Sequence, residues 1–385
     1  MSDNKWFKKE APLQGLTGLW GGVMGALQGG GGTVPFEGTA YNASGGQEST
    51  SNEAVPSAMG DFELSYKTHK FVTGTPSTLS VSQKGSGTHG ETVEVLVVGG
   101  GGGGGVLGGG GGGGGVLYGI RPSGLPATNY NISLGNGGVG DYGWSPSRSN
   151  GQDSQFSPGN SYDCKAYGGG HGASYNSTSQ APGNVANGGG DSHHGNGKDN
   201  NTANQFGTGW QNGAPALGPS YAGSGFAGGD GDPGCCPCTG GGGGGAGQAG
   251  ATSYNAVTKA PGGNGFGPAT LFSGVGAYIG GGGGNTGYCG GQPSDNGGKG
   301  GNGGLGGGGG GATQTEQGPN SGTPGGQVIG GFTTPVCQGV NGAFGGAGTG
   351  GGGGGGANGS GTPTVRGGNG GSGSVFIRYA VGDAT

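Results

Sequence analysis

The chain is short of both charged and apolar residues. Only 28% of its 385 residues are hydrophobic and 9% are charged. An apolar fraction this low excludes a single large hydrophobic core of the ordinary globular kind. The net charge of −5 comes from 14 basic and 19 acidic residues without a basic cluster, so we do not expect the protein to bind nucleic acid.

Long apolar runs are missing as well. No stretch of eighteen or more apolar residues occurs, so the sequence predicts no membrane-spanning helix. Lys5, Lys8 and Lys9 precede a mildly apolar stretch, but Pro12, Gln14 and several glycines interrupt what would be the apolar region of a signal peptide. We therefore expect no secretion signal, and a protein that leaves the cell by assembly onto a larger particle or by lysis.

Sequence motifs for catalysis and cofactor binding are not found. A Walker loop needs Lys followed by Ser or Thr after its glycines, and Gly298-Lys299-Gly300 lacks the hydroxyl residue. The pattern G-x-G-x-x-G occurs throughout polyglycine and carries no information here. Five histidines are scattered through predicted loops, and no Ser/His/Asp or Cys/His set stands out. We expect no enzymatic activity, no catalytic residue and no bound cofactor.

Three short segments resemble metal sites only in part. They are Gly137 to Asp141, Asp230 to Asp232, and His193-His194 beside Asp191. The first has its Asp one place too early for the calcium-binding repeat Gly-Gly-x-Gly-x-Asp, and it occurs once. A solvated turn or a polar loop tip explains the other two equally well or better. The sequence therefore predicts no metal site.

Cysteine is sparse and unevenly placed. The cluster Cys235-Cys236-Pro237-Cys238 has no second CxxC or His pair at the spacing of a zinc site. Disulfides from this cluster to the remaining cysteines are expected if the mature protein lies outside a reducing cytosol. Their connectivity stays open, because six cysteines allow about fifteen pairings. The remaining cysteines are Cys164, Cys289 and Cys337.

Glycine, in contrast, accounts for 121 residues. The strand-like run TVEVLVV passes directly into Gly99 to Gly105, and Val106-Leu107 separates this run from Gly108 to Gly115. Glycine has no side chain to pack inside a strand, so the strand cannot continue in the usual way. Polyproline II suits glycine better, because its three residues per turn direct the peptide groups sideways toward neighbouring chains.

We interpret the glycine runs as rods of one bundle. At a rise of about 3.1 Å per residue, an eight-residue run spans about 25 Å. The alternative is disorder, because ordering glycine costs about 0.5–1 kcal/mol more per residue than ordering alanine. The narrow range of run lengths and the strand-like segments at both ends of the region favour order. The other runs are Gly240 to Gly245, Gly280 to Gly284, Gly306 to Gly311 and Gly350 to Gly356.

Short alternating segments predict β-strands around the first and last glycine runs. The predicted fold is mostly non-helical: a polyglycine-II (polyproline-II-like) bundle combined with a small antiparallel β-sheet or sandwich. We expect one sheet to hold both Val93 to Val98 and Val375 to Tyr379, with the first and last strands as neighbours. The candidate strands are Phe62 to Tyr66, Phe71 to Thr73, Leu79 to Val81, Val93 to Val98, Tyr130 to Leu134 and Ser374 to Tyr379, with a short one near Thr39 to Asn42.

Three regions are predicted along the chain. Residues 1–32 form an attachment peptide, residues 33–61 a linker or loop, and residues 62–385 the glycine-rich domain with variable loops. The attachment peptide has apolar residues at three- and four-residue intervals, but its glycines disfavour an isolated helix. It is expected to order against a partner, the alternative being a flexible tail. Its apolar residues include Trp6, Phe7, Leu13, Leu16, Leu19 and Trp20.

The order of these motifs resembles the glycine-rich domain of structural proteins from tailed phages, especially marine ones, over about residues 62–380. The matching motifs are His69-Lys70-Phe71, Thr73-Gly74, Leu79-Ser80-Val81, Val93 to Val98 with the following glycines, Tyr130-Asn131-Ile132, Leu134 to Gly138, Gly151 to Phe156, Ala166 to Gly170 and Gly371 to Tyr379. More distantly, the architecture is similar to the polyglycine sandwich of tail-fibre tip adhesins. The N-terminal segment and the strands depart from that adhesin.

The resemblance implies a virion structural protein, a tail-fibre or appendage component that displays loops for host attachment. It would be made in the host cytoplasm and bind other virion proteins through its N-terminus, with a host glycan or outer-membrane protein as receptor. Alternatives are a decoration or connector protein, or a non-viral ice-binding or matrix module. Aromatic residues in Ser-, Asn- and Gly-rich loops are typical of recognition surfaces. The candidates are Tyr142, Trp144, Trp210, Tyr221 and Phe226.

Overall fold

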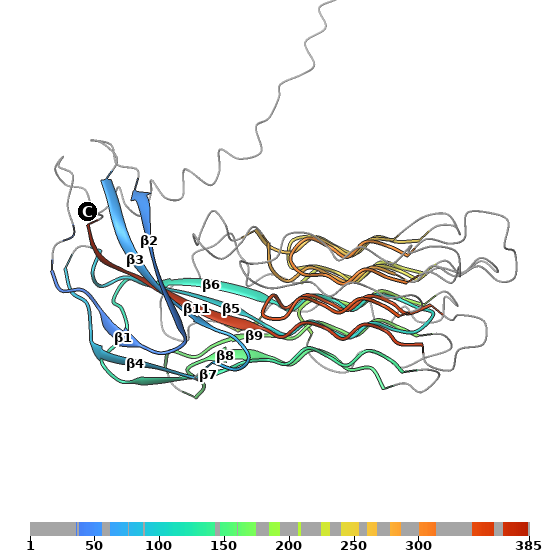
Figure 1. Cartoon of the computed structure of the whole chain (residues 1–385), viewed down its shortest axis with the longest axis horizontal. Coiled ribbons are helices and arrows are strands. Elements are labelled where there is room, and N and C mark those ends of the chain that lie inside the picture. The colour runs from blue at the N-terminus through green and yellow to red at the C-terminus, as the bar shows by residue number, and fades with distance from the viewer. Residues whose placement is uncertain are drawn as a thin grey trace, which may run out of the picture.

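The computed structural model describes residues 36, 38–55, 62–75, 77–87, 89–142, 147–159, 161–174, 185–192, 207–208, 225–231, 240–253, 260–267, 278–285, 300–312, 341–357 and 365–383. Within these ranges the chain contains strands and irregular backbone but no helix, so no helix long and apolar enough to cross a membrane occurs there. Two β-sheets lie at one end of the molecule and the glycine-rich rods at the other (Figure 1). The predicted fold class is confirmed.

The first sheet has five antiparallel strands in the order β2-β3-β11-β5-β6. β11 lies between β3 and β5, with Phe376 opposite Lys70 on one side and Leu96 on the other. The predicted neighbours, the early strand β3 and the last strand β11, are therefore paired. These strands are β2 (Gln47–Val55), β3 (Phe62–Phe71), β5 (Val93–Val98), β6 (Val116–Arg121) and β11 (Ser374–Asp383).

The second sheet has six antiparallel strands in the order β1-β4-β7-β8-β9-β10. Its strands are short, and residues 207–208 form a two-residue strand at its edge. These strands are β1 (Asn42–Ser44), β4 (Thr78–Gln83), β7 (Asn129–Ser133), β8 (Ser154–Phe156), β9 (Cys164–Ala166) and β10 (Gly207–Thr208).

The two sheets pack face to face and enclose the main hydrophobic core. β5, β6 and β11 of the first sheet contact β8 and β9 of the second. Leu79, Tyr130 and Phe156 from the second sheet are completely buried, and so are Val95 and Ile377 from the first. The Tyr130 and Phe156 rings stack with centroids 5.6 Å apart. Most of the buried hydrophobic residues in the described ranges thus belong to this sandwich.

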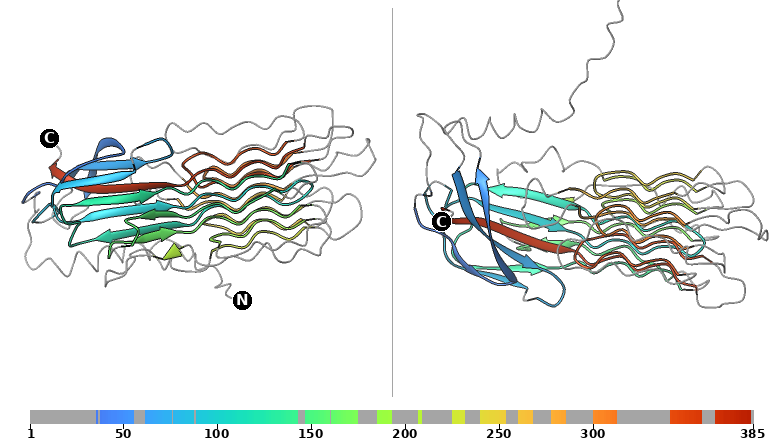
Figure 2. Two further views of the ribbon diagram at one scale, coloured as in Figure 1. Left: turned by 90° about the horizontal axis from the view of Figure 1, so that it is seen from below. Right: turned by 45° about the horizontal axis from the view of Figure 1, so that its top comes forward.

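Strands of both sheets continue directly into the glycine-rich rods. β5 runs into Gly99, and the chain returns from Gly115 into β6. Rods likewise follow β7 and β9 and precede β11, so strands and rods share one long axis (Figure 2). The sandwich therefore sets the spacing and direction of the rods that leave it.

The backbone hydrogen bonds of the rod 99–105 repeat every third residue. The amides of Gly99, Gly102 and Gly105 donate to the carbonyl oxygens of Gly115, Gly112 and Gly109 in turn, at 2.8 to 3.0 Å. The two amides between these positions donate to other rods. In a polyproline-II helix, which has three residues per turn, every third amide points in the same direction. The bonds confirm that the glycine runs form a packed bundle.

The rod 99–105 is surrounded on all sides by other rods. Its amides donate to three of them and its carbonyl oxygens accept from three more, so six rods enclose it. The three rods to which it donates run antiparallel to it, and the three rods from which it accepts run parallel to it. The six are 109–115, 149–152, 368–371, 138–141, 169–172 and 353–356. This hexagonal arrangement satisfies the peptide groups that side-chain-free backbone leaves exposed.

Close approach of the backbones explains why the interior positions are glycine. A Cβ added at Gly111 would lie 2.2 Å from the carbonyl oxygen of Gly102, and one at Gly353 would lie 2.0 Å from that of Gly368. No real Cβ tolerates such contacts with backbone atoms. Glycine is therefore required by packing here, not by a left-handed backbone conformation.

Several segments differ from their predictions. Phe62 to Tyr66 and Phe71 to Thr73, predicted as two strands, form the single strand β3, which ends at Phe71, and β6, β8 and β9 were not predicted. β1 and β2 lie in the region predicted as loop with a short strand near Thr39 to Asn42. β2 has the sequence QESTSNEAV, whose polar residues give no apolar alternation, and its pairing with β3 supplies the order instead. In addition, Gly306 and Gly307 have φ of 96° and 92°, so the run from Gly306 to Gly311 begins with a turn and only its later part forms a rod.

Candidate functional site

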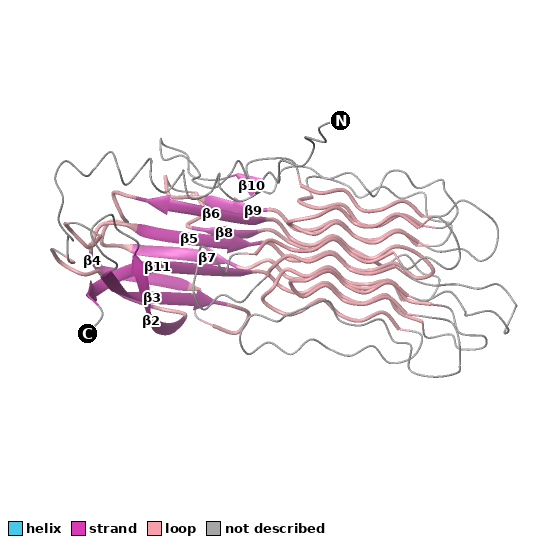
Figure 3. Cartoon of the chain, turned by 90° about the horizontal axis from the view of Figure 1, so that it is seen from above, coloured by secondary structure: helices cyan, strands magenta, loops and turns pink. Residues whose placement is uncertain are grey.

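The end of the bundle farthest from the sheets, here called the rod tip, is where the rods turn or stop (Figure 3). The hairpin between the first two glycine runs closes there, with Leu107 at φ 50°. Val106, Leu107 and Val365 are buried together in a small cluster separate from the main core. This cluster covers the ends of the central rods.

Several connections begin and end at the rod tip. The residues that flank them are joined across neighbouring rods, for example Asn285 to Ala260, Gly301 to Asn285 and Gly342 to Arg366. The chain therefore leaves the described rods and re-enters them at the same end. These connections comprise residues 143–146, 232–239, 254–259, 286–299, 313–340 and 358–364, all of which lie outside the described residues. Every cysteine other than Cys164 falls within them.

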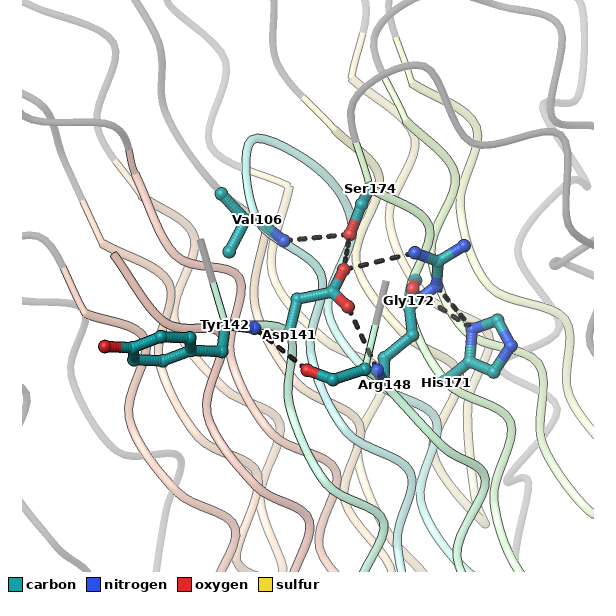
Figure 4. A network of polar contacts seen from close by, with 8 residues as sticks. Val106, Asp141, Tyr142, Arg148, His171, Gly172 and Ser174 are labelled. Carbon is teal, nitrogen blue, oxygen red and sulfur yellow. Dashed lines mark hydrogen bonds and ion pairs between the residues drawn. The ribbon is translucent and has the colours of Figure 1, made fainter. Parts of the chain in front are cut away.

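A buried polar network ties four chain segments together at the rod tip (Figure 4). Arg148 Nη1 lies 3.1 Å from Asp141 Oδ2, and the Arg148 amide donates to Asp141 Oδ1 at 3.0 Å. The Ser174 hydroxyl donates to Asp141 Oδ2 and accepts from the Val106 amide at 3.0 Å. Both charged side chains are 2% exposed, so the ion pair replaces water as partner for each charge.

His171 completes the network as a neutral side chain. Arg148 Nε lies 3.1 Å from His171 Nδ1, and because the guanidinium can only donate, this imidazole nitrogen must accept. Burial lowers the pKa of His171, and the Arg148 charge lowers it further. The Ser174 proton is directed to Asp141 rather than to His171. The arrangement therefore positions rod ends and does not form a serine–histidine nucleophile pair.

Beside this network, three adjacent rods expose one side chain at every third residue. The rod 365–373 donates to the rod 134–141 through Gly367 and Gly370 and accepts from the rod 341–346 through Arg366 and Asn369. We call the solvent-facing surface of these three rods the outer face. Its exposed residues are Asn136, Val139, Tyr142, Phe344, Arg366 and Asn369.

The outer face holds all the exposed large hydrophobic side chains of the described part of the chain. Val139 is 51% exposed, Tyr142 45% and Phe344 46%. The Arg366 guanidinium carbon lies 4.5 Å from the centroid of the Tyr142 ring. The amide oxygen of Asn369 accepts from Gly140 at 2.9 Å, which joins two of the rods across the surface.

The structure separates the two described candidates for surface recognition. Tyr142 lies at the rod tip on the outer face. Phe226 instead lies near the sheets, half-buried against the main core, with its amide donating to Asn187 Oδ1 at 2.9 Å. Its place beside the core suits packing more than contact with a partner. Trp144, Trp210 and Tyr221, and the attachment residues Trp6, Phe7, Leu13, Leu16, Leu19 and Trp20, lie outside the described residues.

Sequence reasoning missed Val139, Phe344 and Arg366. The signal that marks them is their place in glycine-rich segments without long runs. Where larger side chains recur at every third residue of such a segment, as at Asn136, Val139 and Tyr142, a three-residue helix places them on one face.

Comparison with known protein families assigns the rods and most of the strands to one unit. A family model described as a glycine-rich domain matches residues 80–380. The chain belongs to this glycine-rich domain family. No curated protein and no solved structure matches it significantly. The glycine-rich domain in the predicted resemblance is thus confirmed, and its assignment to phage structural proteins stays a prediction.

Proposed function

We propose that this glycine-rich domain protein is a structural component of a tailed-phage virion, a tail-fibre or appendage protein that displays loops for attachment to the host surface. The observation that carries the proposal is the rod tip, where the segments that connect described rods range from four residues (143–146) to twenty-eight (313–340). A frame locked by backbone contacts tolerates change in such connections far better than in its rods. A fixed bundle with connections that can vary suits a protein that presents variable recognition segments.

A decoration or connector role is the second candidate. Val139 and Phe344, on the two rods that flank the rod 365–373, favour it, because exposed apolar side chains on one face are typical of contacts with another protein. In that case the outer face would be covered in the assembled particle.

Location in the particle tests the proposal directly. Antibodies raised against the purified chain and coupled to gold should label tail fibres or other appendages of intact virions by electron microscopy. Label confined to the capsid or the tail tube, or bound only after the particles are disrupted, would reject the attachment role and favour the connector. Label on non-viral extracellular material would reject both.

A further inference from the structure

The outer face has the composition of a surface for a polar ligand with a negative charge. Its exposed side chains are amides, hydroxyls and apolar groups, and its one charge is the guanidinium of Arg366. Within the described part of the chain, no carboxylate lies within ion-pair distance of Arg366. The whole chain, in contrast, has an excess of acidic residues. A lone cation here would complement an anionic partner.

Arg366 is held in place on both sides. Its amide donates to Asn341 Oδ1 at 2.9 Å, and its carbonyl oxygen accepts from the Gly342 amide at 2.9 Å. Its guanidinium carbon lies over the Tyr142 ring, 4.5 Å from the centroid. The N–H groups of a guanidinium in such a cation–π contact can still pair with a carboxylate. Tyr142 is still 45% exposed as a residue.

Neutral hydrogen-bonding groups surround this cation–π pair. Asn369 lies one rod turn from Arg366, and Asn136 lies two turns from Tyr142. Ser149 and Gln152 are exposed one turn apart on the adjoining rod 147–153. Side chains three residues apart on a rod are separated by about 9 Å. The surface thus offers amide and hydroxyl groups at regular intervals along the rods, beside an aromatic ring.

We propose that the outer face binds an acidic polysaccharide, with a sugar carboxylate on Arg366 and a pyranose ring against Tyr142. Aromatic rings provide an amphipathic contact that suits sugar rings, amides pair with hydroxyl groups, and the guanidinium pairs with the carboxylate. The inference rests on the proposed function, because it gives the chemical class of the host-surface receptor and places its contact on the side of the bundle.

The test uses the purified full-length chain and polygalacturonate, with methyl-esterified polygalacturonate and dextran as uncharged comparisons. Binding is measured by biolayer interferometry at low and moderate salt. We expect binding to polygalacturonate, at least tenfold weaker binding to the methyl ester and to dextran, and a loss of affinity as salt rises. The Arg366→Gln and Tyr142→Ala variants should each bind at least tenfold more weakly, and Arg366→Lys should fall between them and the parent.

The matched control is Lys84→Gln, which removes one positive charge from an exposed residue after β4. This variant should bind like the parent, and all variants should melt at the same temperature. Failure of the parent to bind polygalacturonate, equal binding by Arg366→Gln, or equal loss in Lys84→Gln would overturn the proposal. Gold label on appendages without polysaccharide binding would leave the proposed function in place and point to a protein receptor.

Discussion

The amide of Gly111 donates to the carbonyl oxygen of Gly353 at 2.8 Å, which joins the second glycine run to the last one. The two rods touch through backbone alone. The bundle therefore depends on hydrogen bonds between segments that are remote in sequence, and each bond requires that no side chain stand between them. Stability of the whole frame should be sensitive to single added carbon atoms.

We expect Gly111→Val and Gly353→Val each to destabilise the protein by more than about 3 kcal/mol. The reason is the contact of about 2 Å that a Cβ would make with backbone oxygen at either position. Thermal melting and soluble yield measure the effect. Gly382→Ala serves as control, because a Cβ at Gly382 meets nothing within 4 Å. Unchanged melting of both valine variants would contradict the interior placement of these rods.

Sequence patterns predicted the parts of the fold in which a single residue type determines the structure. Runs of glycine indicated rods, and the apolar segments of β5 and β11 indicated a shared sheet. β2 was not predicted, because its order comes from pairing with β3 rather than from an apolar pattern. The rods 134–141, 341–346 and 365–373 were also missed, because their larger side chains interrupt the glycine runs by which rods were recognised.

Asparagine explains part of this failure. The side-chain amide of Asn187 donates to Gly113 and accepts from Phe226, at 2.8 and 2.9 Å, so it replaces a peptide group in the lattice. In sequence such an Asn looks like a loop residue. The candidate site was predictable only for Tyr142, from its loop composition, because its contact with Arg366 depends on chain segments more than two hundred residues apart.

The buried ion pair of the first sheet supports a second prediction. Arg378 Nη2 lies 3.0 and 2.8 Å from the two carboxylate oxygens of Glu94, and both residues are less than 10% exposed. Arg378 Nη1 also pairs with the carboxylate of Glu53, which is less buried. Glu94→Gln should therefore cost about 3 kcal/mol, the low end for breaking a buried pair, because the buried guanidinium keeps only this second partner. Urea denaturation measures the loss.

Two further variants distinguish charge from packing at this pair. Adding Arg378→Met and Glu53→Gln to Glu94→Gln should recover a large part of the loss, since all three charges are then removed. Glu48→Gln, which breaks the exposed pair with Lys67, should cost less than about 1 kcal/mol. Equal losses for Glu94→Gln and Glu48→Gln would show that the buried pair has no special weight.

The rod tip should lose stability in mild acid. The folded-state pKa of His171 is lowered by burial and by Arg148, so the unfolded chain binds a proton at this residue before the folded chain does. Stability from this group is complete above its ordinary pKa of 6.5 and declines as the pH falls from there toward the lowered value. Protonated Nδ1 would release Arg148 and turn to the Gly172 carbonyl oxygen, 3.2 Å away.

Melting temperatures measured from pH 7.5 down to pH 5 check this dependence. Burial also lowers the pKa of His69, so both histidines should contribute to the loss of melting temperature in the parent. His171→Gln and His69→Gln should each make the decline of the melting temperature with falling pH less steep. A decline with the same slope in His171→Gln as in the parent would exclude the network as its source.

The N-terminal residues should be needed for assembly but not for folding. A chain that begins at Thr33 retains every described residue, and we expect it to melt within about 2 °C of the full chain, as surface changes usually do. It should fail to enter particles when it replaces the full chain during infection, which immunoblots of purified virions would show. Normal incorporation of the shortened chain would remove the attachment role of residues 1–32.

Attachment, finally, should depend on aromatic residues outside the described ranges more than the fold does. Trp144, Trp210 and Tyr221 lie in segments outside the described frame, whereas Phe226 lies against the core. Changing the first three to alanine together should weaken adsorption of particles to host cells at least tenfold while the melting temperature of the purified protein changes little. Phe226→Ala should do the opposite, because it removes buried apolar surface. Unimpaired adsorption of the triple variant would favour the connector role, and a collapse of its melting temperature would show that these aromatics pack against the bundle.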